Sequence, residues 1–153
     1  MAKEKILLVD DEPDILELVS YNLEKEGFKV YQASSGSEAI EIAEKKLPAL
    51  IILDVMMPDM DGIETCIQMR SIPALQNTLI TFLSARGEDY SQIAGFDAGA
   101  DDFITKPIKP RVLLSKVKAI LRRKNESQSQ DKELQSEGIS VNKERYIVTK
   151  DGN

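Results

Sequence analysis

Short runs of branched apolar residues recur along most of the chain, and their spacing limits the fold more than any other feature. Within each run there is little alternation of apolar and polar residues, which is typical of strands that are buried on both faces. The runs are Ile6–Val9, Lys29–Ala33, Leu50–Leu53, Leu79–Leu83 and Asp102–Thr105. The pattern therefore predicts five strands in a sheet that is covered on both sides.

Amphipathic stretches lie between these runs and predict five helices. In the first, apolar residues recur at intervals of three and four over Ile15–Leu23, and the last three run over about Gly62–Arg70, Asp89–Ala98 and Pro110–Arg123. Strands that alternate with helices favour a doubly wound α/β sheet of parallel strands. The carboxyl ends of all its strands meet at one edge, where such sheets bind ligands.

The composition changes after the last predicted helix. The segment Asn125–Glu137 is polar, contains no aromatic residue and is typical of a flexible linker. Beyond it, the runs GISVN and RYIVT flank a turn and predict a β-hairpin, which alone is only marginally stable. We therefore expect a first domain over residues 3–124, a linker over 125–137 and an incomplete second domain over 138–153.

The sequence contains no histidine, and this excludes several kinds of site. A Ser-His-Asp triad, a Cys-His pair and a His-ligated zinc or iron are all impossible. The single cysteine, Cys66, lies in a helical pattern, where we expect a small apolar side chain rather than a nucleophile. Chemistry must therefore come from carboxylates, lysine, hydroxyl groups and a hard cation.

Charge and hydropathy limit the partners of the chain. A net charge of −6 without a large basic block argues against a nucleic-acid-binding surface. No apolar run approaches the ~18 residues of a membrane-spanning helix, and the first run is too short for the core of a secretory signal. We therefore expect a cytoplasmic protein that does not contact a membrane.

Charged and hydroxyl side chains follow four of the predicted strands. They are Asp10 and Asp11 after the first strand, Asp54 after the third, Ser84 after the fourth and Lys106 after the fifth. Three carboxylates at one sheet edge repel one another unless a cation lies among them. Oxygen ligands without histidine or cysteine select Mg²⁺ or Mn²⁺. The strand ends therefore predict a site for one of these ions.

Asp54 is the candidate for covalent chemistry. It follows the most hydrophobic run, Leu50–Leu53, which would fix it at the centre of the sheet. Mg²⁺ commonly takes one or two carboxylates, so a third is left to attack phosphorus and form an aspartyl phosphate. Lys106 would offset charge on the phosphoryl oxygens, Ser84 could donate a hydrogen bond to them, and the small Ala85 would leave room.

Each of these residues has a simpler interpretation when it is taken alone. Asp11 and Glu12 could simply cap the first helix. Asp61 suits a helix cap better than a metal site. Ser84 could be an ordinary loop hydroxyl, and Lys106 a surface lysine. Their joint occurrence at the strand ends of one sheet is what favours a functional site.

Four stretches together resemble the response-regulator receiver domain of bacterial two-component signalling. They are ILLVDDE (Ile6–Glu12), LIILDVMMPDMDG (Leu50–Gly62), FLSA (Phe82–Ala85) and GADDFITKP (Gly99–Pro107). The resemblance covers residues 3–124. It implies the flavodoxin-like receiver fold, with five parallel strands in the order 2-1-3-4-5 and five helices.

The resemblance also implies a role for each acid. Asp54 would be the phosphoacceptor. Asp11 and Asp54 would bind Mg²⁺ directly, together with the backbone carbonyl of Met56, while Asp10 would act through a metal-bound water. Mn²⁺ would fit the same oxygen ligands.

Further residues correspond to the switch of the family. The hydroxyl and lysine of the family map onto Ser84 and Lys106, with Ala85 beside the phosphoryl group, and its switch aromatic maps onto Phe103. In the family the hydroxyl moves toward the phosphoryl group and the ring rotates inward behind it. The Lys106–Pro107 peptide bond is expected to be cis.

The last residues, Gly138–Asn153, resemble the opening strands of the winged-helix DNA-binding domain in the OmpR/PhoB class. In that class, phosphorylation promotes a homodimer through the face made by the fourth and fifth helices and the fifth strand. The charges expected on this face are Asp97, Asp101, Asp102, Lys116, Lys118 and Arg122. The implied partners are a sensor histidine kinase, a second copy and DNA, the last only through an effector domain that this chain barely begins.

Two rival functions remain open at this point. A Mg²⁺-dependent phosphohydrolase would share the aspartyl-phosphate chemistry, but it is expected to carry Asp-x-Asp and a substrate cap, whereas Asp10 and Asp11 are adjacent. A pseudo-receiver usually loses an acid or the lysine, and this chain retains them. We expect a regulator that assists its own Mg²⁺-dependent phosphorylation and dephosphorylation, rather than an enzyme acting on other substrates.

Overall fold

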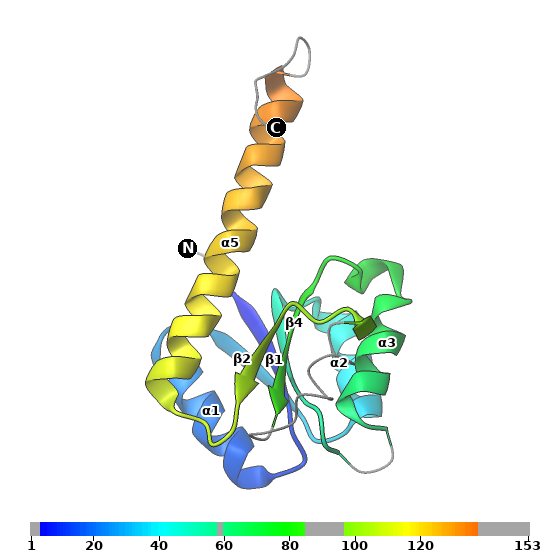
Figure 1. Ribbon diagram of the computed structural model, residues 1–153, viewed down its shortest axis with the longest axis vertical. Coiled ribbons are helices and arrows are strands. Elements are labelled where there is room, and N and C mark those ends of the chain that lie inside the picture. Colours follow the sequence, from blue (N-terminus) through cyan, green and yellow to red (C-terminus); the bar gives the residue numbers. More distant parts are fainter. Residues whose placement is uncertain (1–3, 58–59, 85–96, 138–153) are drawn as a thin grey trace. The chain divides into compact units, whose positions relative to one another are not determined.

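The computed structural model describes residues 4–57, 60–84 and 97–137, with residues 124–137 described by their backbone alone. The chain divides into two units, Met1–Lys116 and Val117–Asn153, and every described strand belongs to the first. Figure 1 shows the described helices and strands.

Five parallel strands form a single sheet in the order β2-β1-β3-β4-β5. Their bounds are β1 Lys5–Val9, β2 Lys29–Ala33, β3 Leu50–Asp54, β4 Leu79–Ser84 and β5 Asp102–Thr105. The register places Asp54 opposite Leu83, and Ser84 opposite Thr105. The predicted fold class and strand order are confirmed, and the strand ends meet at one edge as expected.

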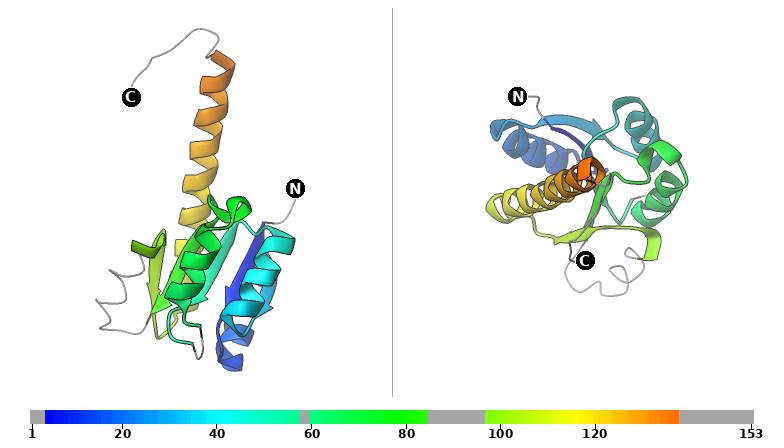
Figure 2. Two further views of the ribbon diagram at one scale, coloured as in Figure 1. Left: turned by 90° about the vertical axis from the view of Figure 1, so that its right-hand side faces the viewer. Right: turned by 90° about the horizontal axis from the view of Figure 1, so that it is seen from above.

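The described helices are α1 Pro13–Lys25, α2 Gly36–Lys46, α3 Gly62–Arg70 and α5 Pro110–Glu137, with a short 3-10 helix, η1, over Pro73–Leu75. Figure 2 shows α2 and α3 side by side on one face of the sheet, with α1 on the other. The helix predicted over 89–98 lies mostly outside the described residues. Among the described helices, none is both long enough and apolar enough to cross a membrane.

Helix α5 continues through the segment 125–137, whose composition indicated a flexible linker. Neither glycine nor proline occurs between Pro110 and Gly138, and Glu, Gln, Lys and Leu all favour helices. A polar composition argues against a packed core, but it does not argue against a helix. The predicted domain boundaries stay predictions.

Strand β3 lies at the centre of the core, and all of its residues are buried. Burying each Leu or Ile side chain of this strand contributes about 1.5–3 kcal/mol. That contribution offsets the cost of placing the carboxylate of Asp54, only 2% exposed, at the end of the strand. The hydrophobic run thus fixes an acidic group where solvent hardly reaches it.

Candidate functional site

Three carboxylates meet at the carboxyl edge of the sheet. Asp10 and Asp11 follow β1, and Asp54 ends β3. One carboxylate oxygen from each lies within 4.8 Å of the other two. Asp10 and Asp54 are buried, whereas Asp11 is exposed. The structure therefore brings together the three acids that the sequence placed at strand ends.

Lys106 supplies the positive charge of this cluster. Its Nζ lies 3.3 Å from Oδ1 of Asp54 and 3.5 Å from Oδ2 of Asp10. Its backbone N–H donates to the carbonyl of Ser84 at 2.7 Å, which holds the residue at the end of β4. The Lys106–Pro107 peptide bond is cis, as the resemblance implied.

Backbone N–H groups orient the two buried carboxylates. The N–H of Met56 donates to Oδ1 of Asp54 at 3.2 Å, and the N–H of Glu12 donates to Oδ1 of Asp10 at 2.9 Å. Glu12 is the N-cap residue of α1, but its side chain makes no capping hydrogen bond. The simpler reading of Glu12 as a side-chain cap is therefore not supported.

A close backbone approach positions the end of β3. The N–H of Gly62, the first residue of α3, donates to the carbonyl of Val55 at 2.9 Å. A Cβ at Gly62 would overlap the carbonyl oxygen of Asp54 and would lie 2.9 Å from the Cα of Val55. Only glycine therefore fits here. In the sequence, only the place of Gly62 after Asp61 marks it as the start of a helix, and the close approach to Asp54 leaves no further signal.

Burial and charge shift the pKa values of the site in opposing ways. Burial, followed by repulsion from Asp10, raises the pKa of Asp54 to about 6, while Lys106 acts against both. Partial burial alone would lower the pKa of the Lys106 ammonium, but Asp54 and Asp10 outweigh it and raise that pKa above its ordinary value. The two carboxylates favour the protonated form of Lys106, and they repel each other.

The predicted switch residues lie next to this cluster. Ser84 is 1% exposed, and its Oγ has no hydrogen-bond partner among the described residues. Phe103 is buried, and its ring centroid lies 5.5 Å from that of Phe82. Ala85 lies outside the described residues.

The donor atoms fit a hard divalent cation. Oδ2 of Asp10 is buried without a hydrogen-bond partner among the described residues, and its one close cation is the ammonium of Lys106. A buried acceptor in this state suits a metal or a metal-bound water. An all-oxygen set of three carboxylates fits Mg²⁺ or Mn²⁺. The side chain of Met56 is 64% exposed.

Other residues singled out by the sequence have structural roles. Asp61 is the N-cap of α3, and its Oδ1 accepts a hydrogen bond from the N–H of Glu64 at 2.8 Å, as predicted. Cys66 is buried, and burial raises the pKa of its thiol to about 11, which leaves it protonated at neutral pH.

The charged residues expected on the pairing face differ in their exposure and in their hydrogen bonds. Asp97 is exposed, whereas Oδ2 of Asp101 accepts a hydrogen bond from Arg70 at 3.1 Å. Asp102 is half-buried at the start of β5, and Lys116 donates to the carbonyl of Phe103 at 2.8 Å. Lys118 and Arg122 belong to the second unit.

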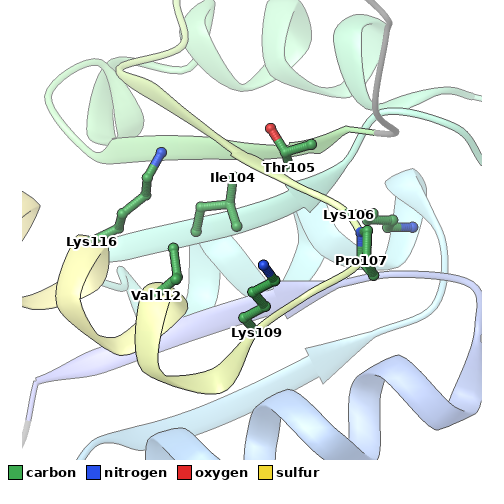
Figure 3. A pocket seen from close by; sticks show the side chains of 7 residues that line it. All are labelled: Ile104, Thr105, Lys106, Pro107, Lys109, Val112 and Lys116. Carbon is green, nitrogen blue, oxygen red and sulfur yellow. The ribbon is translucent and has the colours of Figure 1, made fainter.

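A separate pocket of about 230 Å³ lies beside the connection between β5 and α5 (Figure 3). Figure 3 shows the side chain of Lys106 pointing away from those of Lys109 and Val112. The residues that line the pocket are Ile104, Thr105, Lys106, Pro107, Lys109, Val112 and Lys116. The pocket therefore shares Lys106 with the acidic cluster but contains none of its carboxylates.

Comparison with known proteins points to one family. The model of the response regulator receiver domain matches residues 6–118. The alkaline phosphatase synthesis transcriptional regulatory protein PhoP of Bacillus subtilis is 48% identical over 120 residues, which is 78% of this chain and 49% of that protein. The transcriptional regulatory protein SrrA of Staphylococcus aureus is 44% identical over 119 residues, 78% of this chain and 48% of that protein.

The chain thus spans about half the length of these two regulators. Among solved structures, a two-component response regulator from Clostridium difficile superposes with a TM-score of 0.75 at 32% identity, covering 80% of this chain and 99% of the other.

Proposed function

Because the chain belongs to the response regulator receiver family, we propose that it is a phosphoacceptor switch and that Asp54 receives the phosphoryl group. The observation that supports this most is the ammonium of Lys106, held 3.3 Å from Asp54 and 3.5 Å from Asp10 at the edge where three carboxylates meet. A buried carboxylate beside a fixed cation is suited to attack phosphorus.

The attacking atom is an oxygen of Asp54. Its Oδ1 already accepts hydrogen bonds from Met56 and Lys106, which leaves Oδ2 for the reaction. A bond forms between this oxygen and phosphorus, while the bond from phosphorus to a histidine nitrogen of the sensor kinase breaks. Lys106 then balances charge on the phosphoryl oxygens.

Mg²⁺ or Mn²⁺ would be held by Asp11, Asp54 and the backbone carbonyl of Met56, with Asp10 acting through a bound water, and would neutralise charge on the transferring group. Three acids lie close enough together to share one ion.

The side chains of Ser84 and Phe103 would change position when Asp54 is phosphorylated. The Oγ of Ser84 is buried and has no partner among the described residues, so it is available to donate to a phosphoryl oxygen beside Ala85. The ring of Phe103 would follow it inward. The face that contains β5 and α5, with Asp97, Asp102 and Lys116, would then pair with a second copy.

The wider role follows from the relatives. PhoP and SrrA are transcriptional regulatory proteins, and we propose the same role for the protein to which this receiver belongs. A sensor histidine kinase would supply the phosphoryl group in the cytoplasm, and an effector domain of the OmpR/PhoB class would bind DNA. The receiver would act on its own aspartyl phosphate and on no other substrate.

Phosphorylation by acetyl phosphate tests the proposal. The chain is incubated with acetyl phosphate and Mg²⁺, and its intact mass is measured. One phosphoryl group is expected on the native chain and none on Asp54→Asn, while Asp61→Asn, which keeps a good N-cap residue, is labelled normally. Beryllofluoride should also promote dimers in analytical ultracentrifugation.

Two results would overturn the proposal. One is a native chain that gains no phosphoryl group from acetyl phosphate or from a cognate kinase. The other is an Asp54→Asn variant that is labelled as well as the native chain. Multiple turnover of phosphomonoesters in solution would instead favour the phosphohydrolase.

A further inference from the structure

Arg70, the last residue of α3, lies at the centre of a dense set of hydrogen bonds that contains none of the acids of the cluster. Its Nη2 lies 2.8 Å from the carbonyl oxygen of Gly99 and 3.1 Å from Oδ2 of Asp101. Its Nε also donates to Gly99, at 3.0 Å. Its Nη1 donates to three more carbonyl oxygens, those of Leu75, Gln76 and Thr78. One guanidinium thus joins the end of α3, the approach to β4 and the turn before β5.

Asp101 links this set to β4. Its Oδ2 accepts a hydrogen bond from the N–H of Ile80 at 2.9 Å, and its own N–H donates to the carbonyl of Ile80 at 2.7 Å. The residue therefore holds both backbone groups of Ile80, while Arg70 balances its charge.

The turn is shaped around the arginine. Gly99 has a φ of +110°, which favours glycine. A Cβ at this position would lie 3.0 Å from both Cγ and Nε of Arg70. Two independent requirements, a left-handed backbone and a close side chain, therefore select glycine where the turn meets Arg70.

These bonds differ from an ordinary surface ion pair. The side chains of Lys45 and Glu41 lie 3.9 Å apart and are 71% and 69% exposed, so their interaction is worth little. The side chain of Arg70 is only 19% exposed. Its removal would leave several backbone carbonyls without their donor, which is far more costly than losing an exposed pair.

The position of this set of bonds matters because β5 is short. The strand has four residues and pairs only with β4 among the described strands. Phe103 and Ile104 of this strand are buried, and a slip of one residue would move each side chain to the opposite face. Asp101 holds the start of β5 to Ile80, and at its end the N–H of Lys106 bonds Ser84.

We propose that Arg70 and Asp101 are positioning residues for phosphorylation: they fix β5 on β4 and so place the ammonium of Lys106 against Asp54. The reaction half of this proposal rests on the proposed function, whereas the structural half does not. Asp101 would then act within each receiver, and its side chain is still 40% exposed.

The rate of phosphorylation by acetyl phosphate tests the reaction half. Arg70→Gln removes the charge and the forked donors of the guanidinium. Asp101→Asn keeps one acceptor for the N–H of Ile80, so this variant should have an intermediate effect. With Mg²⁺ and at a temperature where circular dichroism shows each variant folded, the rate should fall about tenfold or more in Arg70→Gln. Glu41→Gln, which alters only an exposed pair, should react at the native rate.

A double-mutant cycle separates positioning from general damage. In Lys106→Ala the group that is being positioned is absent, so adding Arg70→Gln should slow the reaction no further. An equal additional loss in that background would show that Arg70 does not act through Lys106, and it would overturn the proposal.

Amide hydrogen exchange tests the structural half without any phosphorylation. Loss of a purely local contact would speed exchange at Ile80 alone. Loss of the register should also speed exchange at Lys106, whose N–H bonds Ser84 at the far end of the strand. Unchanged exchange at Lys106 in both variants would contradict the proposal, whether or not the native chain accepts a phosphoryl group.

Discussion

The ammonium nitrogen of Lys106 lies 3.3 Å from Oδ1 of Asp54, although the two residues are 52 positions apart in the sequence. The contact forms because β3 and β5 both deliver their carboxyl ends to one edge of the parallel sheet. Lys106 offsets only part of the charge, since burial and Asp10 still raise the pKa of Asp54 to about 6. The metal-free site is therefore an unfavourable arrangement of charge, and its stability should depend on pH and on cations.

Asp54 should make the metal-free protein less stable as the pH rises from about 4 to about 6. In this window the folded state retains a proton on Asp54 that the unfolded chain, with a pKa near 3.8, has released. The group therefore contributes its full stability below pH 4 and loses that contribution through pH 6. After discounting for solvent screening, we expect about 1–2 kcal/mol.

Urea denaturation of the native chain and Asp54→Asn at pH 4 and pH 7 measures this effect. The advantage of the variant in free energy of unfolding should be larger at pH 7 by that amount. Equal differences at the two pH values would show that Asp54 has an ordinary pKa in the folded protein.

Mg²⁺ should stabilise the folded chain, because a cation relieves the repulsion among Asp10, Asp11 and Asp54. At a concentration about 100 times its dissociation constant, a ligand of the folded state adds about 2.7 kcal/mol. Thermal denaturation with increasing Mg²⁺ should show a saturating rise in Tm. Asp11→Asn should weaken the response at little cost to the metal-free fold, since Asp11 is exposed. Glu41→Gln should respond like the native chain, and an equal response in Asp11→Asn would exclude Asp11 from the ion site.

The meeting of the strand ends could be predicted from the sequence, because the topology of a parallel sheet places the carboxyl ends of all strands at one edge. Once the apolar runs were assigned to a parallel sheet, Asp10, Asp54 and Lys106 had to lie at one edge, whatever their distance along the chain. Their side chains do meet there.

Arg70 could not be found in this way. A basic residue in the last turn of a helix suits the helix dipole, so its type and place indicated nothing more. Its partners, the carbonyls around Leu75 and the turn at Gly99, come from loops whose approach depends on tertiary packing. The resemblance places Asp101 on the pairing face, which stays a prediction, but it gives no sign that the carboxylate also bonds Arg70 within the receiver.

Replacement of Asp61 should distinguish a helix cap from a metal ligand. Oδ1 of Asp61 accepts the N–H of Glu64 at the start of α3, so Asp61→Ala should cost about 0.5–2 kcal/mol of unfolding free energy. Asp61→Asn keeps the acceptor and should cost much less. Chemical denaturation measures both, and the Mg²⁺ response of each variant should match that of the native chain. A weaker response would place Asp61 in the ion site.

Gly62→Ala should be among the most damaging single substitutions in the receiver. The added methyl group would overlap the carbonyl oxygen of Asp54 and press on the Cα of Val55, and both are backbone atoms that side-chain rotation cannot move. We expect a loss of about 3 kcal/mol or more in free energy of unfolding. Gly27→Ala is the matched control, because Gly27 has a φ of +99° but nothing within 4 Å of its added Cβ. It should cost only about 1 kcal/mol, through backbone conformation alone. Urea denaturation of both variants separates the two causes, and similar losses would show that α3 can shift away from the end of β3.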